Sequence, residues 1–279
     1  MNQEMRIGLF FNREIEPCAN AAAKIQSAFA GDTGVEFVAG NADSEHGGIN
    51  CAVSIGGDGT FLLAARTIMG SGVPLYGVNM GRLGFLASGD AGSAVDDIRR
   101  IVAGEYGIHT MIPLKAEITK LSQKSRKPLK TTSWAFNEIM IVKNFVSRPV
   151  ALSTYLGGEK LYSFLSDGII ASTPTGSTAY ALSAGGPIIH PGVNCVSIVP
   201  ICAHSLSPRP MLVPCGSDIM IKLDYAQGGA ILSGDGHDGG GLSSGDCVLV
   251  TSDSNSSVDV IKMDGGSYAD VLRDKLNWS

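Results

Sequence analysis

Long hydrophobic runs are missing from this sequence: no stretch of 18 consecutive apolar residues occurs in its 279 positions. A membrane-spanning helix needs about 20 such residues, so we expect none. The first residues, Met1-Asn2-Gln3-Glu4, lack the basic and apolar segments of a secretory signal peptide. The six cysteines form no C-x-x-C pair, and Cys51, Cys195 and Cys247 lie in apolar runs where cysteine acts as a small core residue. These absences predict a soluble, cytoplasmic protein in a reducing compartment.

Charge is also scarce, because charged residues make up 17% of the chain and the formal net charge is -5. An acidic balance disfavours nucleic-acid binding. Hydrophobic residues make up 44%, which is enough for a sizeable core in one large or two ordinary domains. One basic cluster without acidic members is typical of a solvated hairpin loop; it contains Lys120, Lys124, Arg126, Lys127 and Lys130.

Strands and helices alternate over the first hundred residues, which favours a parallel sheet with helices on its faces. The helical segments are recognised by apolar residues at helical spacing and by a glycine that follows each. We expect strands at residues 6–11, 51–55 and 73–78, and helices at residues 21–29, 60–69 and 95–102.

Short runs with a period of two, separated by turns, dominate from about residue 108 onwards. They predict a mostly β second domain, a sandwich or a pair of packed sheets, with a single helical segment at residues 178–184. The end of the chain reverses again, with a strand at 258–263 and a helical stripe formed by Tyr268, Val271, Leu272 and Leu276. We therefore predict a first domain over residues 1–108, to which 258–279 return, and a β-rich domain over 109–257.

The segment Gly56-Gly57-Asp58-Gly59-Thr60 directly follows the apolar run of residues 51–55. A strand that ends in a glycine turn and opens a helix aims backbone N–H groups at an anion, so we expect a phosphate there. Thr60 is expected to cap the helix. A carboxylate beside phosphates needs a metal ion or a proton to accept, which makes Asp58 a candidate metal ligand or general base. The alternative is that Asp58 is an exposed turn residue.

A second glycine-containing segment runs from Thr173 to Pro187 and also reads as a strand, a turn and a helix. Pro174 fixes the chain before the turn and Gly176 frees it. A cluster of hydroxyls suits a nucleotide, although a capped structural helix is the alternative. The hydroxyls belong to Thr175, Ser177, Thr178, Tyr180 and Ser183.

Two adjacent polar residues, Asn137 and Glu138, interrupt the apolar run of residues 135–142. In a strand they face opposite sides, so at least one is expected to be buried. An Asn–Glu pair at a strand end can hydrogen-bond to both hydroxyls of a ribose. A satisfied structural network remains the alternative.

Two familiar nucleotide motifs are excluded. The chain contains no G-x-x-x-x-G-K-[ST], so it is not a P-loop enzyme. A formal G-x-G-x-x-G occurs at residues 234–239, but glycine and serine follow it in place of a helix. It therefore lacks the strand–turn–helix context of a dinucleotide fingerprint.

Taken together, these segments resemble the NAD kinases, which phosphorylate NAD to NADP. Order and spacing agree over about residues 51 to 240. The G-G-D-G-T element is shared with diacylglycerol and sphingosine kinases and, approximately, with 6-phosphofructokinases. The segments that carry the resemblance are residues 56–60, Asn79-Met80-Gly81-Arg82-Leu83-Gly84-Phe85-Leu86, Asn137-Glu138, Asp167-Gly168, residues 173–187, His204-Ser205-Leu206-Ser207 and Arg209-Pro210.

The resemblance implies a fold and a set of site residues. The fold is a Rossmann-like α/β domain, as in 6-phosphofructokinases and diacylglycerol kinases, joined to a C-terminal β-sandwich-like domain. Asp58 looks like the base that activates the 2′-hydroxyl of the adenosine ribose. His237 stands where many relatives have glutamine, which makes a pH-sensitive contact possible. The donor cradle would be Gly56, Gly57, Gly59 and Thr60, and the NAD contacts would be Asp58, Gly59, Asn137, Glu138, Arg148, Asp167, Thr178, Ala179, Tyr180, Ser183 and His237.

The resemblance further implies ATP and NAD as substrates, Mg²⁺ arriving with ATP, and a homodimer or homotetramer. No His/Cys/Asp cluster in the sequence forms a dedicated metal cage, which fits a metal carried by the nucleotide. Three alternatives stay open: a lipid kinase with an apolar acceptor pocket, a sugar-phosphate kinase, and an NAD(H) sensor without catalysis. The sugar-phosphate alternative needs several arginines, and near these motifs the chain has Arg82, Arg148 and Arg209.

Overall fold

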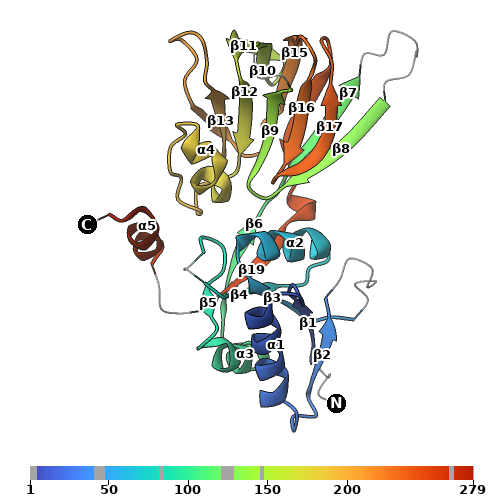
Figure 1. The fold of residues 1–279 in the computed structure, drawn as a ribbon, viewed down its shortest axis with the longest axis vertical. Coiled ribbons are helices and arrows are strands. Elements are labelled where there is room, and N and C mark those ends of the chain that lie inside the picture. Colours follow the sequence, from blue (N-terminus) through green and yellow to red (C-terminus); the bar gives the residue numbers. More distant parts are fainter. Residues whose placement is uncertain are drawn as a thin grey trace. The chain divides into compact units, whose positions relative to one another are not determined.

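The computed structural model describes residues 5–40, 48–81, 84–120, 129–144, 148–263 and 267–278. The chain divides into two compact units, one formed by Met1–Met111 with Asn255–Ser279 and the other by Ile112–Ser254 (Figure 1). Of the predicted basic cluster, Lys124, Arg126 and Lys127 lie outside the described residues. Among the described residues, no helix combines the length and hydropathy that crossing a lipid bilayer requires.

A seven-stranded sheet forms the centre of the first unit. Its strands run in the order β2-β1-β3-β4-β19-β6, and the short β5 pairs with β4. Apart from β6, which is antiparallel to β19, neighbouring strands are parallel. The strands are β1 (Met5–Phe10), β2 (Val35–Ala39), β3 (Cys51–Gly56), β4 (Leu75–Asn79), β5 (Gly89–Asp90), β6 (Gly107–Met111) and β19 (Val258–Lys262).

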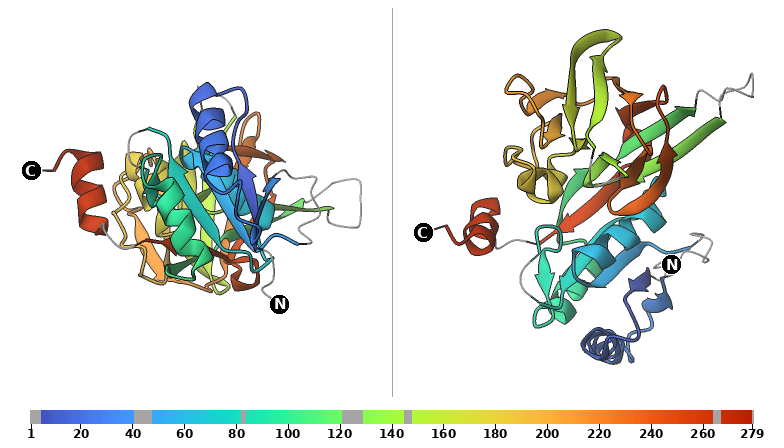
Figure 2. Two further views of the ribbon diagram at one scale, coloured as in Figure 1. Left: turned by 90° about the horizontal axis from the view of Figure 1, so that it is seen from below. Right: turned by 45° about the horizontal axis from the view of Figure 1, so that its top comes forward.

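Helices cover both faces of this sheet. The connections β1-α1-β2 and β3-α2-β4 leave the centre of the sheet in opposite directions, and right-handed crossovers place such helices on opposite faces. Accordingly, one apolar cluster joins buried residues of α1 and α3 to Val53 and Ile55 of β3, whereas the buried residues of α2 lie outside it. The helices on the sheet are α1 (Glu16–Ala28), α2 (Asp58–Ile68) and α3 (Ala94–Val102), which Figure 2 shows from two further directions. A further helix, α5 (Tyr268–Leu276), has no buried residue.

The second unit is a sandwich of two six-stranded antiparallel sheets. One sheet has the order β11-β10-β15-β18-β7-β8, with β7 (Leu114–Lys120), β8 (Leu129–Ala135), β10 (Val150–Leu156), β11 (Glu159–Ser166), β15 (Ile219–Tyr225) and β18 (Cys247–Ser252). The other has the order β14-β13-β12-β9-β16-β17, with β9 (Glu138–Lys143), β12 (Gly168–Ser172), β13 (Cys195–Ile201), β14 (Met211–Pro214), β16 (Ala230–Gly234) and β17 (His237–Leu242). Short helical turns complete the chain: η1 (Thr175–Thr178), α4 (Tyr180–Ser183) and η2 (Ser254–Ser256).

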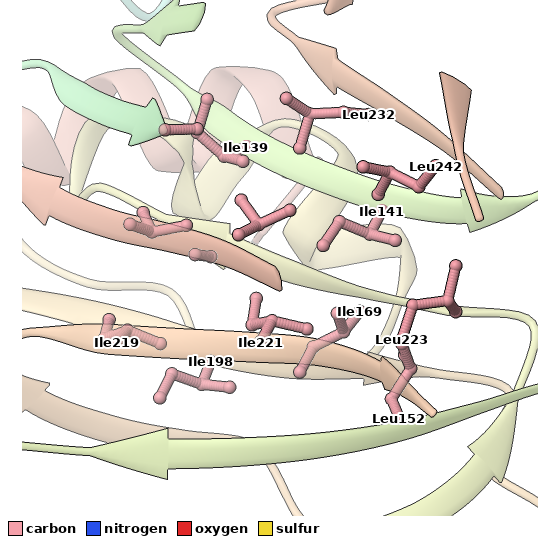
Figure 3. Close-up of a cluster of buried hydrophobic side chains, with 14 of the residues drawn as sticks. Ile139, Ile141, Leu152, Ile169, Ile198, Ile219, Ile221, Leu223, Leu232 and Leu242 are labelled. Carbon is pink, nitrogen blue, oxygen red and sulfur yellow. The ribbon is translucent and has the colours of Figure 1, made fainter. Parts of the chain in front are cut away.

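Aliphatic side chains from both sheets fill the space between them (Figure 3). Ile139 and Ile141 of β9 face this core, as do Ile219 and Ile221 of β15. The alternation of inward and outward residues along these strands is what holds their register, because a shift by one residue would expose every inward side chain. The core thereby fixes where β9 begins, and the polar Asn137–Glu138 pair lies at that end.

The predicted architecture is confirmed: an α/β unit, a β sandwich, and a C-terminal strand that returns to the first sheet as β19. Three local expectations are wrong. Thr60 does not cap α2, because the helix begins at Asp58 and Gly57 is its N-cap. Residues 135–142 are not one strand, because β8 ends at Ala135 and β9 begins at Glu138. Cys247 is half-buried, unlike the buried Cys51 and Cys195.

Candidate functional site

The first candidate site follows β3, at the point where the strand order of the sheet reverses. β1 and β3 are neighbours, and their connections lead to opposite edges of the sheet. In open α/β sheets, ligands bind at the carboxyl ends of strands at such a switch point. The carbonyl of Gly57 accepts hydrogen bonds from the N–H groups of Thr60 at 3.0 Å and Phe61 at 3.1 Å, which closes the first turn of α2. The N–H groups before Thr60 have no acceptor within the helix and face outward.

The fold requires glycine at one position of this turn but not at the other two. A Cβ atom on Gly56 would lie 2.5 Å from Oγ1 of Thr60, so glycine is required there by packing inside the chain. Gly57 and Gly59 are exposed, and a Cβ atom on either would meet nothing within 4 Å. Neither has the positive φ that favours glycine. Nothing inside the described chain therefore requires glycine at these two positions.

Asp58 stands in the first turn of α2 with its two carboxylate oxygens in different situations. Oδ2 accepts a hydrogen bond from the N–H of Phe85 at 3.4 Å. Oδ1 is buried and has no hydrogen-bond partner among the described residues. A Cβ atom on Gly84 would overlap Oδ1, so glycine at 84 is what allows the carboxylate to lie there. A buried carboxylate oxygen without a donor is able to accept one from a ligand or to bind a cation.

The second segment folds as a turn of 3₁₀ helix followed by one short turn of α helix, α4. Ala179 separates the two with φ -96° and ψ -132°, so the predicted continuous helix over 178–184 does not form. A helix of four residues has too small a dipole to attract an anion, so the N-terminus of α4 does not form the kind of anion site that the helix after Gly56 suggests. The N–H of Thr173 and the hydroxyl of Ser172 both bond to the carbonyl of Asn137, at 2.9 and 3.2 Å. The segment is therefore fixed to the start of β9.

The five predicted hydroxyls divide into internal and external ones. Ser177 is fully buried and bonds to the carbonyl of Pro174 and to the N–H of Ile189, so its hydroxyl serves the fold. The half-buried Thr178 donates to the carbonyl of Thr175 at 3.2 Å. Tyr180 and Ser183 are exposed. Thr175 is half-buried, and its carbonyl, not its hydroxyl, receives the bond from Thr178. Tyr180 and Ser183 are therefore the most exposed of the five hydroxyl-bearing residues.

Asn137 directly precedes β9 and Glu138 is the first residue of that strand, beside the last residue of β12. Glu138 is paired with Ser172 across the strands, so the pair lies next to the 173–183 segment. The pKa of Glu138 is raised from 4.5 to about 7: burial is the largest cause, the negative charge of Asp235 adds to it, and a backbone hydrogen bond from Tyr180 opposes both. Oε2 of Glu138 is buried without a hydrogen-bond partner among the described residues. The second unit thus also presents an unsatisfied carboxylate oxygen.

His237 lies near this pair, because it is opposite Gly234 and Gly234 is opposite Ile139, whereas Asp167 lies apart from it. Asp167 precedes β12 and forms an ion pair with Lys143, whose Nζ is 2.5 Å from Oδ1. In the β9–β12 ladder, Val142 is opposite Gly168 and Glu138 is opposite Ser172. Asp167 is five residues from Ser172, so at about 3.3 Å per residue it is about 17 Å from Glu138, at the other end of the two strands. Arg148 is exposed before β10, and His237 is exposed at the start of β17.

Sequence analysis missed three residues that build these sites. Gly84 admits the Asp58 carboxylate, and Thr173 bonds through Oγ1 to the carbonyl of Phe136 at 2.7 Å. Asp235 accepts hydrogen bonds from three consecutive backbone N–H groups at residues 136–138. The Asp-Gly dipeptide is a hairpin-turn signature that could have indicated a β16–β17 turn, but not what its carboxylate contacts. Among the described residues, no group of three or more His, Cys, Asp and Glu side chains gathers to hold a metal ion.

Comparisons with known proteins agree with the resemblance. The ATP-NAD kinase N-terminal domain family matches residues 1–106, and the ATP-NAD kinase C-terminal domain family matches residues 136–263. The NAD kinase of Thiobacillus denitrificans is 40% identical over 229 residues, which cover 82% of this chain and 77% of that protein. The NAD kinase of Syntrophotalea carbinolica is 34% identical over 245 residues, covering 86% and 84%.

Solved structures support the same fold. The crystal structure of yeast NADH kinase complexed with NADH has a TM-score of 0.86 at 21% identity and covers 100% of this chain and 89% of that one. The structure of an NAD kinase from Archaeoglobus fulgidus in complex with ATP has a TM-score of 0.74 at 21% identity and covers 98% and 99%. With matching family models on both units and a relative 40% identical over most of its length, this chain belongs to the NAD kinase family.

Proposed function

We propose that this protein is an NAD kinase that transfers the terminal phosphate of ATP, or of another phosphoryl donor, to the 2′-hydroxyl of the adenosine ribose of NAD. The observation that carries the proposal is the pair of family matches, because residues 1–106 and 136–263 include every residue to which we assign a role. In the reaction, the phosphoryl group leaves the β-phosphate oxygen of ATP and bonds to the ribose oxygen, which loses its proton. The products are ADP and NADP.

The donor phosphates are assigned to the turn of Gly56, Gly57, Gly59 and Thr60. The first N–H groups of α2 point away from the helix and suit an anion. The open space beside Gly57 and Gly59 supports this role, because a side chain there would occupy the place of an approaching phosphate. Phosphoryl transfer depends mainly on positioning and charge neutralisation, and a backbone cradle contributes to both.

Asp58 is assigned as the general base. Its buried Oδ1 has no donor among the described residues and is free to accept the proton of the 2′-hydroxyl. The same oxygen fits the preference of Mg²⁺ for hard carboxylate ligands, so Asp58 is also the residue that would contact the metal that accompanies ATP. When bound, Mg²⁺ neutralises the charge of the donor phosphates.

NAD is assigned to the start of β9 and the segment that follows β12. Asn137 and Glu138 would hydrogen-bond to ribose hydroxyls, and the buried Oε2 of Glu138 supports this by its need for a donor. The exposed Tyr180 and Ser183 lie on α4, and the backbone N–H of Tyr180 donates a hydrogen bond to the carboxylate of Glu138. Thr178, Ala179 and Gly59 are assigned as further NAD contacts.

Asp167 and Arg148 are assigned to parts of NAD remote from the ribose at Glu138, and His237 is assigned to a part near it. As the family resemblance implies, we propose a second copy of the chain as the source of one of these contacts. We therefore propose a homodimer or homotetramer that works in the cytoplasm, where the free cysteines stay reduced. Size-exclusion chromatography with light scattering tests this, and an active monomer at assay concentrations would remove the shared-site idea.

The experiment that tests the function is a coupled assay in which NAD, ATP and Mg²⁺ are supplied and a strictly NADP-dependent glucose-6-phosphate dehydrogenase reports the product. Asp58→Asn is expected to keep NAD binding and to lose most of the turnover. Asp274→Asn is the matched control, since Asp274 is exposed on α5 in the same unit. Near-wild-type turnover of Asp58→Asn would overturn the general-base role.

Two further outcomes identify the alternatives. NAD binding by calorimetry without NADP formation from any donor would favour a sensor. If the protein shows no NAD binding and no turnover, lipid vesicles are the next acceptor to try, because the G-G-D-G-T turn also occurs in lipid kinases.

A further inference from the structure

The β16–β17 hairpin ends in a two-residue turn formed by Asp235 and Gly236. Their φ angles are 49° and 80°, and the flanking Gly234 and His237 pair across the strands. Two consecutive residues with positive φ make the tight turn that matches the twist of a hairpin, and Asp-Gly is one of its preferred sequences. Asp235 is therefore held by the hairpin in a left-handed conformation that directs its carboxylate away from its own strand.

The Asp235 carboxylate binds the backbone that leads into β9. Its Oδ2 accepts the N–H of Phe136 at 2.7 Å, and its Oδ1 accepts those of Asn137 at 2.8 Å and Glu138 at 3.1 Å. The N–H of Asp235 in turn donates to the carbonyl of Glu138 at 3.1 Å. A carboxylate that accepts several backbone N–H groups forms strong, charge-assisted bonds.

The opposite side of the same backbone is held by Thr173. Its Oγ1 donates to the carbonyl of Phe136, and its N–H donates to the carbonyl of Asn137. Both the donors and the acceptors of this short segment are thus satisfied by neighbouring loops, and none of these bonds uses the side chains of Asn137 or Glu138. Those side chains are left for a ligand, in an orientation that the hairpin and the 173–177 turn determine.

We propose that Asp235 is a positioning residue for NAD, which holds the Asn137–Glu138 pair in its binding orientation through the three backbone N–H groups of residues 136–138. This inference rests on the proposed function of the pair as the ribose contact. Asp235 itself acts through the backbone of β9 and is not assigned a contact with the substrate.

The charge of Asp235 has a second consequence, which separates this role from a purely structural one. Three neighbours surround Glu138: the charged Asp235 of the hairpin, the backbone N–H of Tyr180 in α4, and the uncharged Ser172 of β12. An ionised Glu138 accepts hydrogen bonds from ribose hydroxyls better than a neutral one does. NAD binding is therefore expected to tighten as pH rises through about 7, where Glu138 ionises. Removing the negative charge of Asp235 makes that ionisation easier and moves the midpoint to lower pH.

Asp235→Asn is the sharpest variant, because Asn-Gly is also favoured in this kind of turn. The amide nitrogen would replace one acceptor oxygen and face the N–H of Phe136, which leaves that donor without a partner. Asp238→Asn is the matched control: Asp238 is exposed in the same hairpin, and its carboxylate bonds to the N–H of Gly240 at 2.8 Å. The probe is NAD alone, titrated by calorimetry from about pH 5.5 to 8.5, with hydrogen exchange of the peptide that contains residues 136–138.

We expect Asp235→Asn to weaken NAD binding about tenfold or more, to speed exchange at residues 136–138, and to lower the pH midpoint of binding. Asp238→Asn is expected to change none of the three. Unchanged affinity and midpoint in Asp235→Asn would overturn the proposal, as would equal effects in both variants. If the wild-type protein itself does not bind NAD, the proposed function fails, and the hydrogen-exchange comparison still decides whether Asp235 holds the backbone.

Discussion

Replacing Glu138 by glutamine is expected to stabilise the unliganded second unit, and to do so only above a defined pH. The carboxyl group is buried at the start of β9, and burial raises its pKa from 4.5 to about 7. At a pH between these two pKa values, Glu138 keeps its proton in the folded protein but has lost it in the unfolded chain. Stability therefore falls as pH rises through this window and is constant on either side of it.

The magnitude follows from the same pKa values. A pKa change of one corresponds to about 1.4 kcal/mol, so an ionised Glu138 costs the folded unit about 3 kcal/mol. Glutamine has nearly the same shape, keeps an oxygen for the N–H of Tyr180, and carries no charge at any pH. The stability of Glu138→Gln relative to wild type is therefore expected to rise by about 2 to 3 kcal/mol from about pH 5 to about pH 8.

The assay uses the positions of the two tryptophans. Trp134 lies in β8 of the unit that contains Glu138, and Trp278 lies near the C-terminus in the other unit. In a Trp278→Phe background, denaturant unfolding followed by fluorescence reports the β-rich unit alone. Glu159→Gln, at an exposed position of the same unit, removes an equal charge and is expected to leave the pH dependence as in wild type. A stability difference between Glu138→Gln and wild type that does not change with pH would refute the reasoning.

Two glycine substitutions are expected to have opposite effects. Gly59→Ala adds a Cβ atom in open space in the first turn of α2, so it should stabilise the protein by about 0.5 kcal/mol or less through helix propensity and yet reduce turnover by obstructing the donor phosphate. Thermal unfolding and the NADP assay measure both effects, and full activity would contradict the cradle role. Gly176→Ala places a Cβ atom against the carbonyl oxygen of Asn137, so it should destabilise the protein by about 1–3 kcal/mol or more, measured by denaturant unfolding of the same unit. An unchanged stability would mean that the 173–177 turn is not tightly held to β9.

The sequence was sufficient for the parts of the structure that depend on neighbouring residues. The buried run before Gly56, the turn and the helix after it are all determined within about fifteen positions, and periodicity identifies them. The helix boundary was misplaced because threonine is a frequent N-cap, whereas here the carbonyl of Gly57 already accepts the first helical bonds. Helix ends are decided by backbone geometry that composition does not reveal.

The start of β9 could not be predicted for a different reason. Its backbone partners are Asp235, nearly one hundred positions later, and the residues 172–173. Residues 136 and 137 belong to an apolar run, and periodicity assigns them to a strand. In the structure the Asp235 carboxylate accepts the N–H groups of residues 136 and 137, and Thr173 donates to both of their carbonyls, so these residues stand outside the ladder and β9 begins at Glu138.

The glycines illustrate how function can be separated from folding in a chain of this family. Gly176 and Gly234 are crowded by backbone carbonyls of Asn137 and Trp134, which is a reason within the fold. Gly59 has no such neighbour and no unusual backbone angle, and in the first turn of α2 it is a weaker helix former than alanine. A residue that weakens the fold and is not required by packing is most simply explained by what approaches it from outside. The free space beside Gly59 and its weak helix propensity therefore support the phosphate cradle that we propose for this turn.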